Sequence, residues 1–310
     1  MAIKPSNILV TGGTGFLGRS LVRKLVTDGH SIQVISRSKK YPEHPKITTH
    51  YGNITSLQDL KQAIRGCTAV FHCAAEKNDL EQMETVNVAA TRLLFNLASD
   101  SKIKFFCHLS SVGVIGKTNQ RVVDELTPCN PMNLYEETKY AAEKIVNQGM
   151  GSGSVVVLRP TNVFGAETLQ PWLDDSLRSR MRLLLKGNEN AHLVYAEDVA
   201  AAAAYLLHLP SDNAVSIYNV SCDEDTGNTY REVQNYLASK TQKAPHPFVI
   251  TAPLSIPYCI RWIRNGGKTN CGDVIYSSQR LRDAGFHYPY GLQMGLCEAV
   301  NSLLGLSSLP

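Results

Sequence analysis

The chain has 310 residues, of which 43% are apolar and 19% charged, and its net charge at neutral pH is +4. This length is enough for about two domains with a full hydrophobic core, and the low charge excludes an intrinsically disordered chain. The 31 basic residues are too evenly balanced by 27 acidic ones to predict a nucleic-acid partner. The longest uncharged run, residues 244–260, contains four prolines and therefore does not predict a membrane-spanning helix.

The cysteines and the N-terminal residues indicate the cellular compartment in which the protein resides. None of the eight cysteines has CxxC spacing, and several lie in apolar strand-like runs, so we expect reduced thiols and neither a disulfide framework nor a metal site. The chain reaches a core-strand pattern by Ile8, which leaves no room for a signal peptide. We therefore expect a cytoplasmic protein.

Short apolar runs alternate with helix-like segments through the first half of the chain. Strands are predicted at residues 7–11, 31–36, 46–51, 68–75, 103–111 and 154–160, and helices at 15–28, 57–64, 81–99 and 135–147. Continuous apolar strands that alternate with helices are typical of a parallel sheet covered on both faces. The predicted fold class is therefore α/β, a doubly wound Rossmann-like sheet.

The alternation loosens after Pro160. Residues 166–190 are charged, 193–209 are predicted to form a buried alanine-rich helix, 215–221 a strand, and 228–310 mostly short helices. We expect a dinucleotide-binding domain from 1–164 with about 191–220. About 165–190 with 221–310 are expected to form a smaller mixed α/β lobe that binds the substrate.

A glycine array separates the first predicted strand from the first helix. Gly12, Gly15 and Gly18 follow a G-x-x-G-x-x-G spacing. Glycines there permit a tight turn, the close approach of a diphosphate and the packing of the helix on the strand. The diphosphate would bind at the helix N-terminus, and Phe16 and Leu17 join this candidate cofactor site. The alternative interpretation is an ordinary glycine turn.

The residues after the second strand indicate which dinucleotide is bound. Ser36, Arg37, Ser38, Lys39 and Lys40 follow one another, with no acidic residue among them. NAD sites usually place a carboxylate at this position to hold the ribose hydroxyls, whereas basic side chains suit the 2′-phosphate of NADP. We therefore predict NADP in preference to NAD, with Ser36 and Arg37 as ligands. A solvated basic loop is the alternative.

Tyr135 and Lys139 are candidate catalytic residues. They are four positions apart in a predicted helix and therefore lie on one face. A neighbouring ammonium stabilises a phenolate and lowers the tyrosine pKa, so Tyr135 can exchange a proton with an alcohol while hydride moves to or from a nicotinamide. Ser110 and Ser111 follow the strand at 103–111, at the edge of the sheet where ligands bind.

These motifs, in their order and spacing, resemble the extended short-chain dehydrogenases/reductases of the NAD-dependent epimerase/dehydratase (nucleotide-sugar) family. The matching segments cover nearly the whole chain: TGGTGFLG, GNIT, VFHCAA, VNVAATRLL, HLSSVGVIG, YEETK, LRPTNVFG, VYAEDVA, YNV and RLRDAGFHYPY. The resemblance implies that Ser111, Tyr135 and Lys139 form the catalytic set and that Tyr135 and Lys139 also touch the cofactor.

The resemblance also implies further contacts. Asn53 stands where the family has an aspartate that contacts adenine, and Ile54 follows it. Ala74 and Ala75 would line the nicotinamide ribose, and Pro160 and Val163 the carboxamide pocket. Asn87 is expected to be a structural or adenosine-side residue, and a homodimer would form through helices near 81–99 and 131–149.

Departures from the family pattern narrow the reaction. Val112 and Gly113 stand where sugar 4,6-dehydratases carry an acid pair, so we do not expect dehydration. Reduction of a 4-keto group, dehydrogenation or epimerisation at one carbon remains. The expected substrate is a nucleoside diphosphate sugar, with substrate-binding candidates that are polar or cationic: Ser111, Asn162, Arg178, Arg180, Arg182 and Arg231. A shortened insert before VYAEDVA counts against a sugar, and Asp198 there is predicted to cap the following helix.

Two other classes of function stay open. One is a ketoreductase or dehydrogenase of a hydrophobic alcohol, steroid-like or flavonoid-like, for which the proline-rich run 247–263 would floor an apolar pocket or touch a membrane surface; plain lobe core is the alternative. The other is a non-catalytic dinucleotide sensor, which the complete set of Ser111, Tyr135 and Lys139 argues against.

Overall fold

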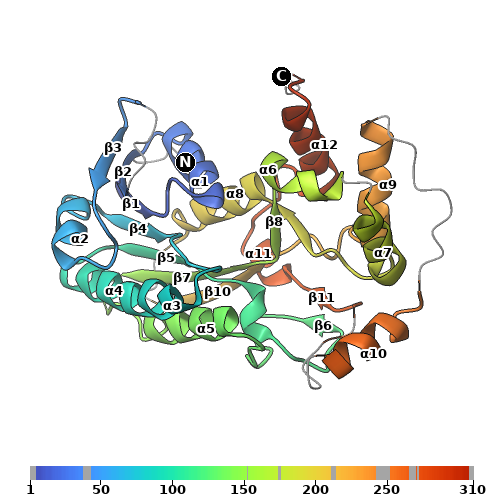
Figure 1. The fold of residues 1–310 in the computed structure, drawn as a ribbon. Coiled ribbons are helices and arrows are strands. Elements are labelled where there is room, and N and C mark those ends of the chain that lie inside the picture. Colours follow the sequence, from blue (N-terminus) through green and yellow to red (C-terminus); the bar gives the residue numbers. More distant parts are fainter. Residues whose placement is uncertain are drawn as a thin grey trace. The chain divides into compact units, whose positions relative to one another are not determined.

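The computed structural model describes residues 5–37, 43–151, 153–173, 176–210, 214–241, 252–264, 270 and 272–306 (Figure 1). Its main sheet has seven strands in the order β10-β7-β5-β4-β1-β2-β3. The strands are β1 (Asn7–Thr11), β2 (Ser31–Ser36), β3 (Ile47–Tyr51), β4 (Ala69–His72), β5 (Phe105–Leu109), β7 (Ser154–Pro160) and β10 (Val215–Val220). The neighbouring pairs from β3 to β7 are all parallel.

Helices cover both faces of this sheet (Figure 1). One face carries α2 (Leu57–Ala63), α4 (Ala90–Asp100) and α5 (Leu134–Val146), and the other carries α1 (Phe16–Thr27) and α8 (Ala196–Leu206). Alternate strand residues such as Leu9, Val70 and Phe106 pack under the first set of helices in one buried cluster. The predicted doubly wound α/β fold class is confirmed.

The chain divides into two compact units. The first comprises Met1–Val114, Asn133–Arg159 and Val199–Tyr218, and the second comprises Ile115–Met132, Pro160–Asp198 and Asn219–Pro310. Our expected domains, 1–164 with 191–220 and 165–190 with 221–310, concern which residues bind cofactor and substrate. The division into compact units does not show which residues bind the cofactor or the substrate, so our assignment of the two domains stays a prediction.

The second unit is a mixed α/β lobe. It contains two small parallel sheets, β6 (Val122–Val123) with β11 (Ile275–Tyr276) and β8 (Asn162–Phe164) with β9 (Leu193–Tyr195). Its helices are α6 (Ala166–Leu169), η3 (Gln170–Trp172), α7 (Leu177–Lys186), α9 (Tyr230–Lys240), α10 (Ser255–Arg264), α11 (Gln279–Asp283) and α12 (Gly291–Leu303).

Two predicted helices differ in detail. The helix predicted over 193–209 is wrong at its start, because Leu193–Tyr195 pair with β8 as a strand and α8 begins only at Ala196. The helix predicted over 81–99 is α3 (Leu80–Met83) and α4 joined by a π-helical turn, η1 (Glu84–Ala89). Such π-turns are frequent at functional sites.

Within the part of the chain that the structure describes, no helix has the length and apolar character needed to cross a membrane. The described cysteines are free thiols.

Candidate active site

A pocket of about 380 Å³ lies at the carboxyl ends of β1 to β4, the edge where open α/β sheets bind ligands. Eight of the predicted cofactor residues line it: Gly12, Gly15, Ser36, Arg37, Asn53, Ile54, Ala74 and Ala75. Six further lining residues were not predicted: Thr14, Ile35, Gly52, Cys73, Glu76 and Val86. Phe16, Leu17 and Gly18 lie directly beside the pocket, in the first turn of α1.

The glycine turn is too tight for any other residue type. Gly12 has a φ of +69°, and a Cβ there would lie 2.6 Å from the backbone nitrogen of Ala74. A Cβ on Gly18 would lie 2.1 Å from the carbonyl oxygen of Gly12, which also accepts the N–H of Gly15 at 2.9 Å. Helix α1 starts at Gly15 with no side-chain cap and no acidic residue in its first turn. This turn fits the diphosphate of a dinucleotide, because no side chain caps the N-terminus of α1.

Arg37 and Glu76 place opposite charges in the pocket. Arg37 is exposed, while Ser38, Lys39 and Lys40 lie outside the described residues. One carboxylate oxygen of Glu76 accepts the backbone N–H groups of Asn78 at 2.9 Å and Asp79 at 3.2 Å. These bonds, with a smaller effect from Arg37, lower the pKa of Glu76. Glu76 is therefore an ionised group of this pocket. Its position directly after the VFHCAA motif is the sequence signal that could have placed it there.

Asn53 helps to fix the backbone at the end of β3. Its backbone N–H donates to Asp59 at 2.8 Å, and its side-chain oxygen accepts the N–H of Thr55 at 3.2 Å. A Cβ on the preceding Gly52 would lie 2.7 Å from the Asp59 side chain. The side-chain nitrogen of Asn53 is therefore the atom left to bond an acceptor on a base.

The three predicted catalytic residues lie on adjoining elements of the first unit. Ser111 follows β5, and its Oγ accepts the N–H of Gly113 at 3.1 Å in the 3₁₀ turn η2 (Val112–Ile115). A Cβ on Gly113 would lie 3.3 Å from Ser111 Oγ and 3.1 Å from Glu136 Cγ. The turn after β5 therefore packs against the first turn of α5. Tyr135 and Lys139 both lie on this helix, one turn apart.

The protonation of this pair differs from the expectation. Lys139 is buried, its Nζ donates to the carbonyl oxygen of Leu109 at 2.5 Å, and burial lowers the pKa of Lys139 to about 8. Burial, and then the charge of Glu136, raise the pKa of Tyr135. The pKa of Tyr135 is therefore raised and not lowered as the spacing predicts, because the burial of Tyr135 itself is the largest effect.

Asn87 connects the pocket to the catalytic helix. Its buried side chain sits in the π-helical turn and accepts the N–H of Glu76 at 2.8 Å. Its amide nitrogen donates to the carbonyl oxygen of Glu76 at 2.8 Å and to Thr138 Oγ1 at 3.0 Å. Thr138 in turn donates to the carbonyl oxygen of Tyr135 at 2.9 Å. Of the two roles expected for Asn87, these contacts show the structural one.

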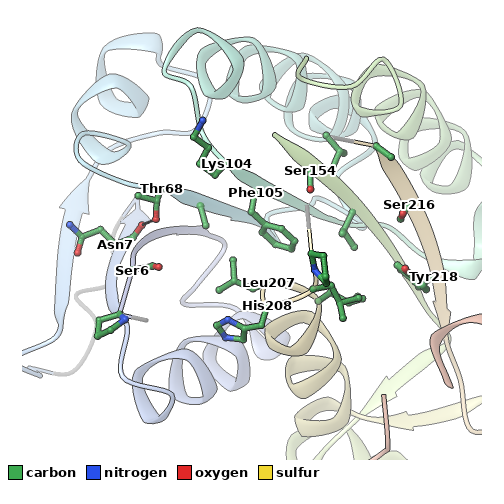
Figure 2. Close-up of a pocket in the computed structure, with 18 of the residues that line it drawn as sticks. Ser6, Asn7, Thr68, Lys104, Phe105, Ser154, Leu207, His208, Ser216 and Tyr218 are labelled. Carbon is green, nitrogen blue, oxygen red and sulfur yellow. Dashed lines mark hydrogen bonds between the residues drawn. The ribbon is translucent and has the colours of Figure 1, made fainter. Parts of the chain in front are cut away.

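A second pocket, about 640 Å³ in volume, lies at the opposite edge of the same sheet (Figure 2). It is lined by residues at the amino-terminal ends of strands, among them Asn7, Thr68, Lys104 and Ser154. Because ligands of such sheets bind at the carboxyl ends, this larger pocket is not the candidate site.

The predicted substrate residues of the second unit are spread over three elements, β8, α7 and α9, the last of which carries Arg231. Asn162, on β8, is exposed, and its amide donates to the carbonyl oxygen of Ala191 at 2.8 Å. Arg180 is exposed on α7, whereas the side chain of Arg178 lies outside the described residues. The guanidinium of Arg182 donates to the carbonyl oxygen of Pro171 at 3.0 Å and lies 5.9 Å from the Trp172 ring centre. Their role in binding stays a prediction.

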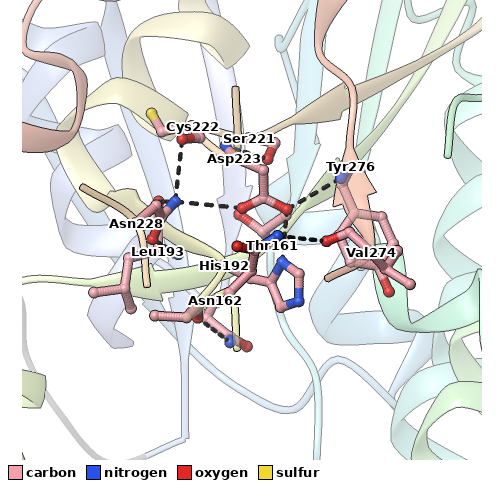
Figure 3. A network of polar contacts seen from close by, with 12 residues as sticks. Thr161, Asn162, His192, Leu193, Ser221, Cys222, Asp223, Asn228, Val274 and Tyr276 are labelled. Carbon is pink, nitrogen blue, oxygen red and sulfur yellow. Dashed lines mark hydrogen bonds and ion pairs between the residues drawn. The ribbon is translucent and has the colours of Figure 1, made fainter. Parts of the chain in front are cut away.

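A buried polar network surrounds Asp223 in the second unit (Figure 3). His192 Nδ1 lies 2.6 Å from Asp223 Oδ2, which also accepts the N–H of Tyr276 at 3.0 Å. The other carboxylate oxygen accepts the Asn228 amide at 3.3 Å. The carboxylate accepts all these bonds, so Nδ1 of His192 carries the hydrogen. His192 has a φ of +54°, a costly conformation that this network holds in place.

The capping role predicted for Asp198 is wrong. Helix α8 begins two residues earlier, at Ala196, so Asp198 lies inside its first turn. Its carboxylate instead accepts the backbone N–H of Tyr290 at 3.0 Å, where α12 begins. Burial raises the pKa of Asp198 to about 7.

The parallel sheet, the glycine turn and the pocket at the carboxyl edge define a protein of the Rossmann-like α/β fold, with its pocket where such folds bind dinucleotides. A sequence model of the NAD dependent epimerase/dehydratase family matches residues 8–221. The chain belongs to this family, as the motif resemblance implied.

The similar proteins include enzymes named for sterols and an enzyme named for a lipid-linked sugar. A sterol-4-alpha-carboxylate 3-dehydrogenase (decarboxylating) of Dictyostelium discoideum is 31% identical over 52% of this chain and 54% of its own length. The chain thus spans about half the length of the first relatives it matches. An N-acetyl-alpha-D-glucosaminyl-diphospho-ditrans,octacis-undecaprenol 4-epimerase of Escherichia coli O157:H7 is 24% identical over 94% of this chain and 93% of its own.

Solved structures share this fold over most of the chain. The Bordetella bronchiseptica enzyme WbmH in complex with NAD+ has a TM-score of 0.75 at 17% identity, covering 97% of this chain and 99% of that one. The Thermus thermophilus UDP-glucose 4-epimerase in complex with NAD has a TM-score of 0.71 at 23% identity, covering 96% and 98%.

Proposed function

We propose that the chain is an NADP-dependent oxidoreductase that transfers hydride at a secondary alcohol or ketone carbon of a nucleoside diphosphate sugar, without loss of water. The observation that carries the proposal is the packing of the Ser111 turn against the start of α5, which brings a serine hydroxyl beside the helix that holds Tyr135 and Lys139. No proton-transferring side chain stands at Val112 or Gly113, which supports the exclusion of dehydration.

The pocket residues divide among the parts of the dinucleotide. The backbone from Gly12 to Gly18 would hold the diphosphate, Ser36 and Arg37 the 2′-phosphate, Asn53 and Ile54 the adenine, and Ala74 and Ala75 the nicotinamide ribose. Pro160 and Val163 belong to the second unit, and their place at the carboxamide stays a proposal. The bound dinucleotide supplies or accepts the hydride.

Ser111 and Tyr135 would act on the oxygen of the reacting carbon. Ser111 Oγ accepts the N–H of Gly113, so its own hydrogen is available to orient that oxygen. Tyr135 Oη then gives its proton to the oxygen when the ketone is reduced, and takes it back when the alcohol is oxidised. Because its pKa is raised, Tyr135 holds its proton at neutral pH.

The catalytic assignment is tested with Tyr135→Phe and a matched control, Tyr140→Phe, on the same helix. Tyr140 lies 4.3 Å from the Lys144 ammonium at its ring face and has no part in the proposed proton transfer. Tyr135→Phe should lower kcat roughly 10²–10⁴-fold with NADPH binding unchanged, the usual contribution of a general acid. Tyr140→Phe should retain normal turnover. Near-normal turnover of Tyr135→Phe would reject the assignment.

The cofactor preference is tested with Arg37→Asp. The exposed guanidinium at the pocket supports binding of a 2′-phosphate, and an aspartate would instead accept hydrogen bonds from ribose hydroxyls. The variant should lose NADPH affinity and gain NADH affinity, measured by fluorescence titration of both. Unchanged NADPH affinity in the variant means that Arg37 does not bind the 2′-phosphate.

A hydrophobic alcohol is the second candidate substrate, favoured by the 31% identity to a sterol dehydrogenase. Mass spectrometry of nucleotides that co-purify with the protein distinguishes the two, since a bound nucleoside diphosphate sugar supports the first. Turnover of a 3β-hydroxysteroid but of no sugar nucleotide supports the second. Cofactor binding without turnover of either would favour a dinucleotide sensor. The homodimer through 81–99 and 131–149 also stays a proposal.

A further inference from the structure

Helix α10 (Ser255–Arg264) exposes its apolar face. Ile256, Ile260 and Ile263 follow an i, i+4, i+7 spacing, which puts them in one stripe along the helix. Ile256 and Ile260 are about half exposed and Ile263 is 75% exposed. Cys259, within the same stripe, is also exposed. In a globular protein such a stripe normally faces the core, so its exposure here needs a reason.

The opposite side of α10 faces the protein. Pro257 is buried, and the guanidinium of Arg261 forms an ion pair with Glu189, whose side chain is buried. Because 257 and 261 are one turn apart, the inner face of the helix is fixed by a proline and a paired arginine. The isoleucine stripe is therefore held outward by contacts on the inner face.

Helix α7 (Leu177–Lys186) contacts α10 and exposes apolar side chains of its own. Leu177 is 77% exposed and Met181, one turn on, is about half exposed. The backbone N–H of Ala252, just before α10, donates to the carbonyl oxygen of Leu184 at 2.8 Å, which ties the start of α10 to α7. Two contacting helices thus present large apolar side chains to solvent.

The charges of the two helices are all of one sign. Their sequences, LRSRMRLLLK and SIPYCIRWIR, contain six basic residues and no acidic one. Arg261 is paired with Glu189 on the inner face, and the side chains of Arg178 and Arg264 lie outside the described residues, which leaves Arg180, Arg182 and Lys186 on α7. Trp262, about half exposed, flanks the isoleucine stripe. Helices that lie in the headgroup region of a membrane typically combine exposed apolar residues, a tryptophan and basic residues without acidic ones.

We propose that α7 and α10 form a docking surface for an anionic membrane. The isoleucine stripe of α10 enters the boundary between headgroups and acyl chains, and the basic side chains of α7, of which Arg180 is exposed, meet lipid phosphates. The helices lie on the membrane and do not span it. A second copy of the chain is a poorer partner, because a two-fold contact would bring the same all-positive helices against each other.

This docking would suit a substrate that resides in a membrane, which both a sterol and a polyprenol-linked sugar do. Two similar proteins are named for such molecules. The docking itself does not depend on the proposed hydride transfer, so either can fail without the other.

The test is co-sedimentation of the full chain with phosphatidylglycerol-rich vesicles and with pure phosphatidylcholine vesicles. We expect binding to the anionic vesicles that weakens as salt rises, since screening reduces the attraction of exposed charges. Ile260→Ser with Ile263→Ser should lower the partition coefficient roughly 10²-fold, about tenfold for each apolar side chain that no longer enters the membrane. The matched control is Leu126→Ser, because Leu126 is 84% exposed and lies on neither helix.

Each outcome of this experiment supports or overturns the proposal that α7 and α10 dock on a membrane. The proposal holds if the double variant loses vesicle binding while its melting temperature, its NADPH affinity and the binding of Leu126→Ser stay at wild-type values. No binding of the wild type to anionic vesicles at low salt overturns it. So does binding that survives in the double variant, or a concentration-dependent dimer, seen by light scattering, that the double variant abolishes.

Discussion

Asn87→Ala should remove the hydrogen bonds that connect the cofactor pocket to the catalytic helix, α5. The Asn87 side chain is bonded to both backbone groups of Glu76, in the pocket, and to Thr138 on α5. Thr138 lies between Tyr135 and Lys139 and bonds the carbonyl oxygen of Tyr135. Truncation at Asn87 therefore removes the side chain that holds the end of β4 and α5 at a fixed spacing.

The three lost hydrogen bonds set the size of the effect. Each contributes a net ~0.5–1.5 kcal/mol, and a donor left buried without a partner costs about 1–3 kcal/mol. Glu76 N–H loses its acceptor, whereas Thr138 Oγ1 still donates to Tyr135. We expect the variant to lose about 2–4 kcal/mol of the free energy of unfolding.

Urea denaturation of the free protein measures this loss, and Asn96→Ala is the matched control. Asn96 lies on α4 and is exposed, so its truncation should change the free energy of unfolding by less than about 0.5 kcal/mol. Asn87→Ala should also weaken NADPH binding and lower kcat, and Asn96→Ala should do neither. If both variants unfold at the wild-type midpoint, the Asn87 contacts do not stabilise the site.

Two further predictions concern the second unit. The pKa of Asp198 is about 7 in the folded protein against 3.8 for an unperturbed aspartate, so the folded state binds more protons between pH ~4 and ~7 and stability falls as pH rises through that window. Asp198→Asn should remove this fall, which amounts to no more than about 4 kcal/mol at 1.36 kcal/mol per pKa unit; a wild-type pH dependence in the variant, measured by urea denaturation, would contradict the burial argument. His192→Asn should unfold within about 1 kcal/mol of the wild type, because asparagine tolerates a positive φ and its amide can donate to Asp223, whereas His192→Val should lose several-fold more. Equal stability of the two His192 variants in the same assay would show that the strained backbone is not held by Asp223.

The main sheet was predictable because its central strands are buried on both faces. Strands β1, β5 and β7 are largely apolar runs, which the chain shows without any knowledge of their partners. The short strands β6, β8, β9 and β11 have two or three residues each, too few for a periodic pattern. Leu193–Tyr195 are a strand only because Asn162–Phe164 pair with them, and that pairing joins residues about thirty positions apart.

The site was predictable where backbone geometry demands a residue type. Gly12 and Gly18 are required by a positive φ and a close contact, so their spacing carries the signal. Glu76 has no such requirement, and it enters the pocket only because Asn87 holds the chain after β4. The partner of His192 is likewise set by folding, since Asp223 follows it by 31 positions.

The bond between Lys139 and Leu109 changes the role that the tyrosine–lysine spacing suggests. The spacing predicts an ammonium that stabilises a phenolate, but a buried ammonium bonded to a backbone carbonyl has its charge partly compensated there. Tyr135 is then left with its own burial and the nearby Glu136, both of which favour the neutral phenol. In the proposed reaction Lys139 would therefore position α5 against the end of β5, and Tyr135 would act first as a proton donor. A ketone substrate needs such a donor, whereas an alcohol substrate needs a base.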